Sequence, residues 1–317
     1  MSEQAYLNLL QDILDNGEQT PIFGHTDKYL LSCIGTTLKF DLTKGFPVLS
    51  TKKTFYKGSF VELLWFIEGS GNIPKLHKQG VKYWNGWGVK HWNRTHNTNL
   101  TKDEYSKLID EGVITDHCIP LHYTNMTNWK YTNWEATQLD SEYRFSSLDQ
   151  TKWLIDYIKQ TPERKSFMVM HWDPETTYQQ SETTGRESVE LPACPFYHHV
   201  LLKGNKLTLV VGIRSSDAFL GLPLNIAQYA LLAHMYAHVL DKEANQVIFH
   251  LNDYHAYSNL KEQIKEQLTR QPYELPQLNI ADRGQQYLQD FSTEDFQVVN
   301  YKSHPALKGE LTIVGGY

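Results

Sequence analysis

The chain has 317 residues and a formal net charge of −6, from 30 Lys and Arg against 36 Asp and Glu, a size that fits one large domain or two tightly packed ones. Because the basic residues are spread over the whole length, no DNA or RNA face is expected, and a small substrate fits better than a polymer. The absence of a basic leader, of any run of about 18 apolar residues and of CxxC spacing predicts a cytoplasmic protein without membrane spans, disulfide framework or metal site.

The first elements alternate between helical and extended patterns. Apolar residues recur at helical spacing over residues 6–14 and stop before Gly17, which predicts a short amphipathic helix ended by a left-handed glycine. Residues 29–42 are rich in β-formers and predict a strand. Residues 59–67 are too apolar for a surface helix, so the carboxylate of Glu62 within them is expected to be paired or used.

The middle of the chain shows little periodicity. Residues 84–148 are rich in Trp, Tyr, Asn, Thr and His, which suggests an inserted, loop-rich subdomain. We place this insertion at about residues 88–147 of a single domain that spans residues 1–317. Order returns with a predicted helix over residues 149–159 and a strand over residues 167–172.

The C-terminal half predicts a hairpin and a central helix. Two strand-like runs, residues 197–202 and 207–213, are separated by Lys-Gly-Asn-Lys at 203–206, which is a hairpin turn signal. Residues 225–240 predict a long helix that is apolar nearly all round and therefore buried at the centre of the fold. A further strand and a polar surface helix are predicted at residues 247–251 and 259–269.

Single polar residues of this half have ordinary structural interpretations when each is taken alone. Cys194 alone is most often a small buried hydrophobe, Asn225 alone a helix N-cap, and His255 alone a hydrogen-bonded core histidine. Arg214 alone is an ordinary salt-bridge partner. Their order and spacing along the chain, rather than any one of them, point to an active site.

Two long motifs resemble the thymidylate synthase family. Residues 191–195, Leu-Pro-Ala-Cys-Pro, are similar to its nucleophile loop, and residues 214–227, Arg-Ser-Ser-Asp-Ala-Phe-Leu-Gly-Leu-Pro-Leu-Asn-Ile-Ala, to its signature. The similarity continues at residues 45–53, 62–66, 253–259 and 267–270. It implies an α/β (α+β) fold with a large twisted mixed sheet flanked by helices, and a symmetric homodimer packed sheet against sheet.

The resemblance also implies a methyltransferase that moves a one-carbon unit from methylenetetrahydrofolate to C5 of dUMP, giving dTMP. Cys194 would add to C6 of the ring as a thiolate, with Arg214 lowering its pKa. The Asn225 amide would hold the base edge, which suits uracil, whereas an aspartate would favour cytosine. Glu62 would order water and relay protons. The implied catalytic residues are Cys194, Glu62, Asn225 and Asp217.

Substrate and folate contacts follow from the same resemblance. The phosphate would meet Arg214 and Ser215, and the sugar hydroxyl would meet His255 and Tyr257. Methylenetetrahydrofolate is the co-substrate that supplies both the carbon and the hydride, so no metal and no flavin are implied. The residues expected to bind the folate, by stacking, packing or a hydrogen bond, are Trp84, Trp87, Asp217, Leu220, Gly221 and Leu224.

The expected phosphate contacts depart from the family pattern. His25 stands for the arginine of the family's phosphate loop. The paired arginines that the family sends across its dimer interface align with Lys165 and Ser166, with Arg164 one position early. Altered folate-side residues, with Leu224 in place of the usual Phe, and the altered C-terminus leave open a pyrimidine nucleotide 5-hydroxymethylase, in which water captures the methylene adduct. The changed phosphate loop leaves open a paralogue that binds nucleotide or RNA without turnover.

Overall fold

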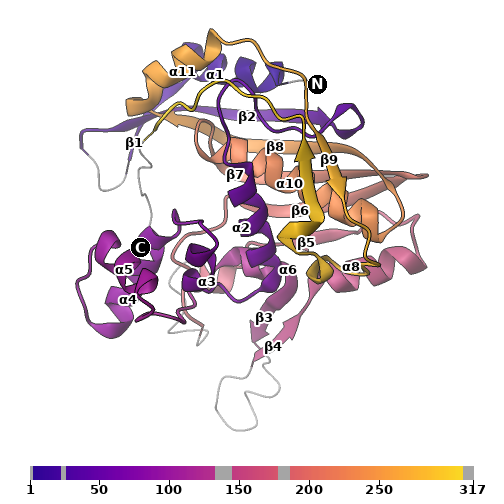
Figure 1. Ribbon diagram of the computed structural model, residues 1–317, viewed down its shortest axis with the longest axis horizontal. Helices are drawn as coiled ribbons and strands as arrows, with labels where there is room; N and C mark the ends of the chain where they lie inside the picture. The colour runs from indigo at the N-terminus through magenta and orange to yellow at the C-terminus, as the bar shows by residue number, and fades with distance from the viewer. Residues whose placement is uncertain (1–2, 23–25, 133–144, 178–185, 310–317) are drawn as a thin grey trace. The chain divides into compact units, whose positions relative to one another are not determined.

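The computed structural model describes residues 3–22, 26–132, 145–177 and 186–309 (Figure 1). The chain divides into two compact units, which are named unit 1 and unit 2 here. Unit 1 comprises Met1–Phe60, Ile155–Met168 and Cys194–Val314. Unit 2 comprises Val61–Leu154, Val169–Ala193 and Gly315–Tyr317.

The main sheet is mixed and six-stranded, in the order β1-β2-β8-β7-β6-β5. Its strands are β1 (Glu18–Pro21), β2 (Tyr29–Asp41), β5 (Met168–Met170), β6 (Pro195–Lys203), β7 (Lys206–Asp217) and β8 (Glu243–Tyr257). Strands β7 and β8 run parallel, while β1 with β2, β2 with β8, and β6 with β7 pair antiparallel. The large mixed sheet expected from the sequence is therefore confirmed.

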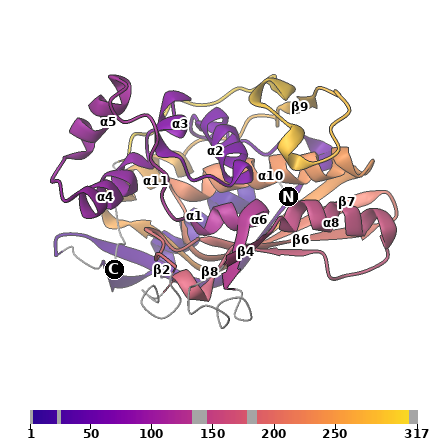
Figure 2. The ribbon, with the colours of Figure 1, turned by 90° about the horizontal axis from the view of Figure 1, so that it is seen from below.

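Helix α10 (Gly221–Val239) packs on one face of β7 and β8 and forms the centre of unit 1 (Figure 2). Of its 19 residues 14 are buried, because apolar side chains cover nearly its whole circumference. Helix α1 (Gln4–Asn16) packs on β2. The predicted central helix and N-terminal amphipathic helix are thus confirmed. No helix in the described ranges has the length and apolarity that a membrane crossing requires.

Glycines at two predicted chain reversals behave differently. Gly204, in the turn between β6 and β7, has a φ of 59°, which is the left-handed conformation that a tight hairpin needs. Gly17, after α1, has φ −65° and ψ 124°, so the predicted left-handed end of this helix is wrong. Glycine is needed there for space, because a Cβ on Gly17 would lie 2.4 Å from the carbonyl oxygen of Ile13.

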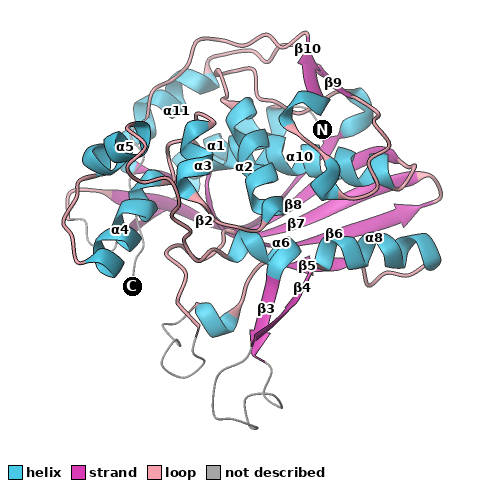
Figure 3. Cartoon of the chain, turned by 60° about the horizontal axis from the view of Figure 1, so that its bottom comes forward, coloured by secondary structure: helices cyan, strands magenta, loops and turns pink. Residues whose placement is uncertain are grey.

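The rest of unit 1 consists of short helices and a small two-stranded sheet. Strands β9 and β10 form a separate antiparallel pair (Figure 3). The predicted polar helix near residue 265 is confirmed as α11. The short elements of this unit are η1 (Leu42–Lys44), η4 (Ser258–Leu260), α11 (Lys261–Leu268), β9 (Gln277–Ile280), η5 (Leu288–Asp290), η6 (Thr293–Asp295) and β10 (Phe296–Val299).

Unit 2 contains regular helices in the stretch for which the sequence suggested loops. A capping box between Thr101 and Glu104 begins α5. The elements of this unit are α3 (Ile73–Lys78), α4 (Asn85–His96), α5 (Lys102–Asp110), η2 (His122–Thr124), α6 (Asn125–Asn128), η3 (Pro174–Thr176) and the antiparallel pair β3 (Trp129–Thr132) and β4 (Phe145–Leu148). Helices α2 (Tyr56–Glu68) and α8 (Gln150–Gln160) belong in part to each unit.

His234 in α10 is expected to make the protein sensitive to acid. Burial lowers its pKa from 6.5 to about 4, and its Nε2 has no hydrogen-bond partner within the described residues. The unfolded chain therefore takes up this proton first as the pH falls, and the free energy of unfolding decreases between pH 6.5 and pH 4. At pH 5 the loss should be about 2 kcal/mol.

The variant His234→Leu removes this titration and keeps an apolar side chain in the helix. Urea unfolding at pH 8 and pH 5 measures the effect. The protein with His234 should lose about 2 kcal/mol more between these two pH values than the leucine variant. Equal losses in the two proteins would show that His234 does not titrate differently on folding.

Candidate active site

The carboxyl ends of β7 and β8 meet at one edge of the sheet because the two strands run parallel. Their register pairs Ser215 with Asp253 and Asp217 with His255. The backbone N–H of Ala218 continues this pairing by donating to the carbonyl oxygen of His255 at 2.8 Å. The strand ends therefore bring four predicted substrate contacts to one edge, namely Arg214, Ser215, His255 and Tyr257.

Cys194 lies one residue before β6 and beside the end of β7. The backbone N–H of Arg214 donates to the carbonyl oxygen of Cys194 at 2.9 Å, which extends the β6–β7 pairing by one residue. The thiol is partly exposed and forms no disulfide. Burial raises the pKa of Tyr257, and the nearby Asp217 carboxylate raises it further. We call Cys194, Arg214, Ser215, Asp217, His255 and Tyr257 the Cys194 cluster.

Asp253 links the two predicted sugar and phosphate contacts of the cluster. Its Oδ1 accepts a hydrogen bond from His255 Nδ1 at 2.5 Å and a long one from Ser215 Oγ at 3.5 Å, and its Oδ2 accepts from Ser32 Oγ. Burial raises the pKa of Asp253, but the hydrogen bonds from His255 and Ser32 outweigh it, so the net shift is downward. The carboxylate thus orients the imidazole, a role the sequence analysis missed although Asp253 lies two residues before His255.

The beginning of α10 presents its predicted contact residues on one face, because residues three or four apart share a side of a helix. The partly exposed residues are Leu220, Gly221, Leu224 and Asn225, and those between them are buried. Asp217 Oδ1 accepts from the backbone N–H groups of Phe219 and Leu220 at 3.0 Å each, which fixes the turn into the helix. The Asn225 side-chain amide has no hydrogen-bond partner in the described part of the chain, so it is available to a ligand.

Lys52 is a second residue that the sequence analysis did not assign to the site. Its ammonium donates to the carbonyl oxygen of Phe219 and lies 3.4 Å from the centre of the Phe219 ring. Burial lowers the pKa of Lys52 to about 7, although the nearby Asp217 carboxylate acts in the opposite direction. The available sequence signal was a lysine pair after an apolar loop, and it did not reveal that Lys52 is buried beside the turn at Asp217.

Within unit 2, Glu62 is hydrogen-bonded to Trp84, which the sequence predicted to bind the folate. Trp84 Nε1 donates to Glu62 Oε1 at 2.5 Å. Burial raises the pKa of Tyr83, and the nearby Glu62 charge adds to this effect. The indole rings of Trp84 and Trp87 lie 5.2 Å apart and are tilted by 53°. The predicted carboxylate and the two predicted folate tryptophans therefore form one buried group.

Two of the remaining predicted phosphate contacts, Arg164 and Lys165, lie on a surface loop of unit 1. Arg164 and Lys165 are exposed on the loop between α8 and β5, and the Arg164 guanidinium lies 5.5 Å from the Tyr157 ring. Within the described chain, no hydrogen bond or ion pair connects either side chain to the cluster. His25 lies outside the described residues.

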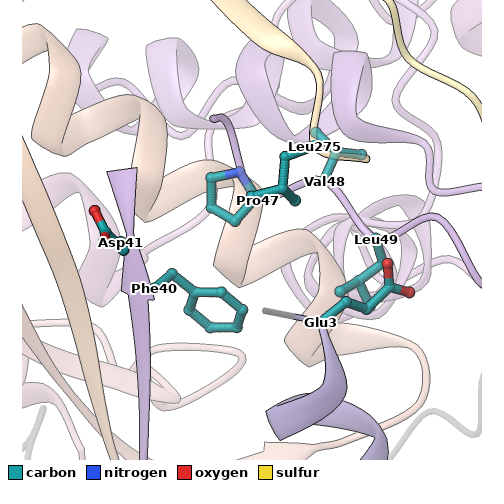
Figure 4. Close-up of a pocket in the computed structure, with 7 residues that line it drawn as sticks. All are labelled: Glu3, Phe40, Asp41, Pro47, Val48, Leu49 and Leu275. Carbon is teal, nitrogen blue, oxygen red and sulfur yellow. The ribbon is translucent and has the colours of Figure 1, made fainter. Parts of the chain in front are cut away.

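A small cavity in unit 1 contains none of the predicted site residues (Figure 4). Its free volume of about 10 Å³ holds one water molecule at most, so it is too small for a nucleotide. The residues that line it are Glu3, Phe40, Asp41, Pro47, Val48, Leu49 and Leu275.

Comparison with known proteins agrees with the motifs. The family model described as thymidylate synthase matches residues 4–313. The thymidylate synthase of Mycoplasma mobile is 31% identical over 310 residues, which cover 98% of this chain and 100% of that protein. The thymidylate synthase of Malacoplasma penetrans is 34% identical over 312 residues, with the same coverage of 98% and 100%. The resemblance inferred from the motifs is confirmed, and the chain belongs to the thymidylate synthase family.

Proposed function

We propose that this protein is a methyltransferase that converts dUMP to dTMP through a covalent bond between Cys194 and the pyrimidine ring. One observation supports this most strongly. The parallel register of β7 and β8, together with the β6–β7 hairpin, gathers a partly exposed thiol, a guanidinium-bearing residue, an imidazole and a phenol at one edge of the sheet. This set supplies a nucleophile together with groups that recognise a phosphate and a sugar hydroxyl.

The residues of the cluster have distinct tasks in this proposal. The Cys194 thiolate adds to C6 of the uracil ring, and the electron pair displaced from the C5–C6 double bond makes C5 nucleophilic. The Asn225 amide donates to the ring oxygen on which negative charge develops and accepts from the imide N–H. Arg214 and Ser215 bind the phosphate. His255 and Tyr257 bind the sugar, with Asp253 holding the imidazole in one orientation.

The residues assigned to the folate fit its chemistry. Methylenetetrahydrofolate supplies both the carbon and the hydride when it is bound. In unit 2, the buried Nε1 of Trp87 has no hydrogen-bond partner within the described residues, so it is a donor that a polar ligand can satisfy. In unit 1, the Asp217 carboxylate accepts from the pterin, and Leu220, Gly221 and Leu224 offer the apolar face of α10. Glu62 orders water and relays protons.

Incubation of the purified protein with dUMP and methylenetetrahydrofolate tests the proposal. Formation of dTMP and dihydrofolate in equal amounts is the expected result. A hydroxymethylated nucleotide without dihydrofolate would instead support the hydroxymethylase. Binding of dUMP with no product would support the paralogue that has lost turnover.

Asn225→Asp should lower kcat/KM for dUMP by about 100-fold or more. A carboxylate cannot donate to the ring oxygen, and it places a negative charge where negative charge develops in the reaction. Steady-state kinetics with dUMP measure the loss. Asn279→Asp on β9 adds the same charge at an exposed position of unit 1 and should leave kcat/KM unchanged. A fully active Asn225→Asp enzyme would remove the amide from base recognition.

The homodimer expected from the family resemblance is also part of the proposal. Ile34 on β2 is 88% exposed in the single chain, and Met168 on β5 is 43% exposed, so the sheet carries apolar surface that a second copy can cover. Sedimentation analysis at micromolar concentration should give twice the mass of one chain. The cytoplasmic location expected from the sequence stays a prediction.

A further inference from the structure

His122 is a fully buried histidine that is hydrogen-bonded to the backbone of Ala193, the residue before Cys194, and the proposed reaction gives it no role. It begins the short helix η2, and its side chain is inaccessible to solvent. Its Nδ1 accepts the backbone N–H of Ala193 at 3.2 Å. Ala193 immediately precedes Cys194, so the imidazole fixes the backbone one residue before the nucleophile.

The neighbours of His122 fix the protonation state and orientation of its ring. Nε2 lies 3.3 Å from the hydroxyl oxygens of both Thr176 and Thr177. Each hydroxyl donates its own proton to the carbonyl oxygen of Asp173, at 3.5 and 2.6 Å, so each can accept from Nε2–H. Nδ1 therefore carries the lone pair that Ala193 needs. The Trp172 ring, 5.2 Å away between ring centres, packs beside the imidazole.

The turn that holds His122 is itself tied to the segment leading to the nucleophile. Arg186 forms ion pairs with Asp173 at 2.7 Å and with Glu175 at 2.8 Å, and the Arg186 and Asp173 side chains are only 10% and 2% exposed. The backbone N–H of Val189 donates to the carbonyl oxygen of Thr176 at 3.0 Å. The chain before Cys194 is thus held at Arg186, at Val189 and at Ala193, and all of these contacts lie within unit 2.

We infer that His122 is a positioning residue for the nucleophile: its Nδ1 holds the Ala193 peptide so that the Cys194 thiol stays in the attacking position. The inference rests on the proposed function, because it takes Cys194 as the nucleophile. Displacement of a reacting group by about 1 Å costs about 100-fold in rate. Loss of this hydrogen bond should therefore lower kcat and leave the KM for dUMP nearly unchanged.

Three substitutions at His122 separate positioning from packing. His122→Asn keeps an oxygen acceptor near the place of Nδ1, whereas His122→Gln extends its amide toward the place of Nε2, and His122→Leu offers no acceptor. We expect the leucine and glutamine variants to lose roughly 10- to 100-fold in kcat, and the asparagine variant to recover most of it. His234→Leu removes a partly buried histidine of unit 1 that plays no part in the site and should keep the kcat of the unmodified protein.

The rate of Cys194 alkylation by iodoacetamide, followed by mass spectrometry, reports on the thiol without requiring methyl transfer. It should change in the leucine and glutamine variants and return in the asparagine variant. A folded His122→Leu protein with unchanged alkylation rate and kcat would overturn the inference, as would an asparagine variant that behaves like glutamine. If the leucine variant does not fold, the comparison of asparagine with glutamine decides. If the unmodified protein forms no dTMP, the proposed function fails, and the alkylation rates still test the positioning.

Discussion

Replacement of Cys194 by alanine is expected to lower the rate of dTMP formation by at least about 10,000-fold, because no other group of the cluster can form the bond to C6. The thiol is partly exposed and lies beside the end of β7, and its side chain is small, so its removal should leave the fold intact. Binding of dUMP should persist, since Arg214, Ser215, His255 and Tyr257 remain.

The other two cysteines supply matched controls for this experiment. Cys33 is partly exposed on β2, and Cys118 is exposed in unit 2, and neither forms a disulfide. Cys33→Ala and Cys118→Ala should keep the full rate. Calorimetric titration with dUMP and the rate of dihydrofolate formation measure binding and turnover separately. Unchanged turnover in Cys194→Ala would remove the thiol from the mechanism.

The elements that the sequence predicted well are those whose pattern is set by the main core. Helix α10 is apolar all round because it is buried at the centre of unit 1, and the β6–β7 hairpin carries its own turn signal at Gly204. In both cases the local pattern and the tertiary environment agree, which is why a pattern read along the chain was sufficient.

The helices of unit 2 were missed because polar aromatic residues build part of its interior. Tyr105 hydroxyl and His117 Nδ1 are 2.5 Å apart, His117 Nε2 and His91 Nδ1 are 2.8 Å apart, and His91 Nε2 lies 3.0 Å from Glu187. Such side chains carry no apolar period, since their burial depends on hydrogen bonds to one another. Burial, with repulsion from His91, lowers the pKa of His117 to about 4, which keeps this interior chain neutral at that ring.

In the candidate site, the sequence predicted which residues take part but not which distant residues contact them. The motifs supplied Cys194, Arg214 and Asn225, because these lie within long contiguous runs. Partners distant in sequence could not be predicted. Lys52 donates a hydrogen bond to the carbonyl oxygen of Phe219, and His122 accepts one from the backbone N–H of Ala193, which lies 71 residues further along the chain. Such pairs are set by the sheet register and by loop packing, and no local pattern encodes them.

The hydrogen bonds between Glu3 and the Ser50–Thr51 segment are also between residues distant in sequence, and we expect them to contribute strongly to stability. Its carboxylate lies at the cavity of Figure 4, and the residue is only 3% exposed. Oε2 accepts from the backbone N–H and hydroxyl of Ser50 at 2.8 and 2.6 Å. Oε1 accepts from the same two groups of Thr51 at 2.8 and 2.5 Å. Four buried donors therefore depend on one side chain, and the segment they fix leads directly into Lys52.

Glu3→Ala should lower the free energy of unfolding by roughly 3–5 kcal/mol, because two backbone N–H groups and two hydroxyls lose a charged acceptor at a site that water reaches poorly. Glu3→Gln keeps one carbonyl oxygen and should lose about half as much. Urea unfolding at pH 7 measures both variants. Glu18→Ala, at an exposed position of β1, should change stability by less than about 0.5 kcal/mol. If Glu3→Ala unfolds at the same urea concentration as Glu18→Ala, the four hydrogen bonds do not anchor the Ser50–Thr51 segment. Its other contacts, such as the Arg270 guanidinium donating to the Thr51 carbonyl oxygen at 2.8 Å, then hold it in place.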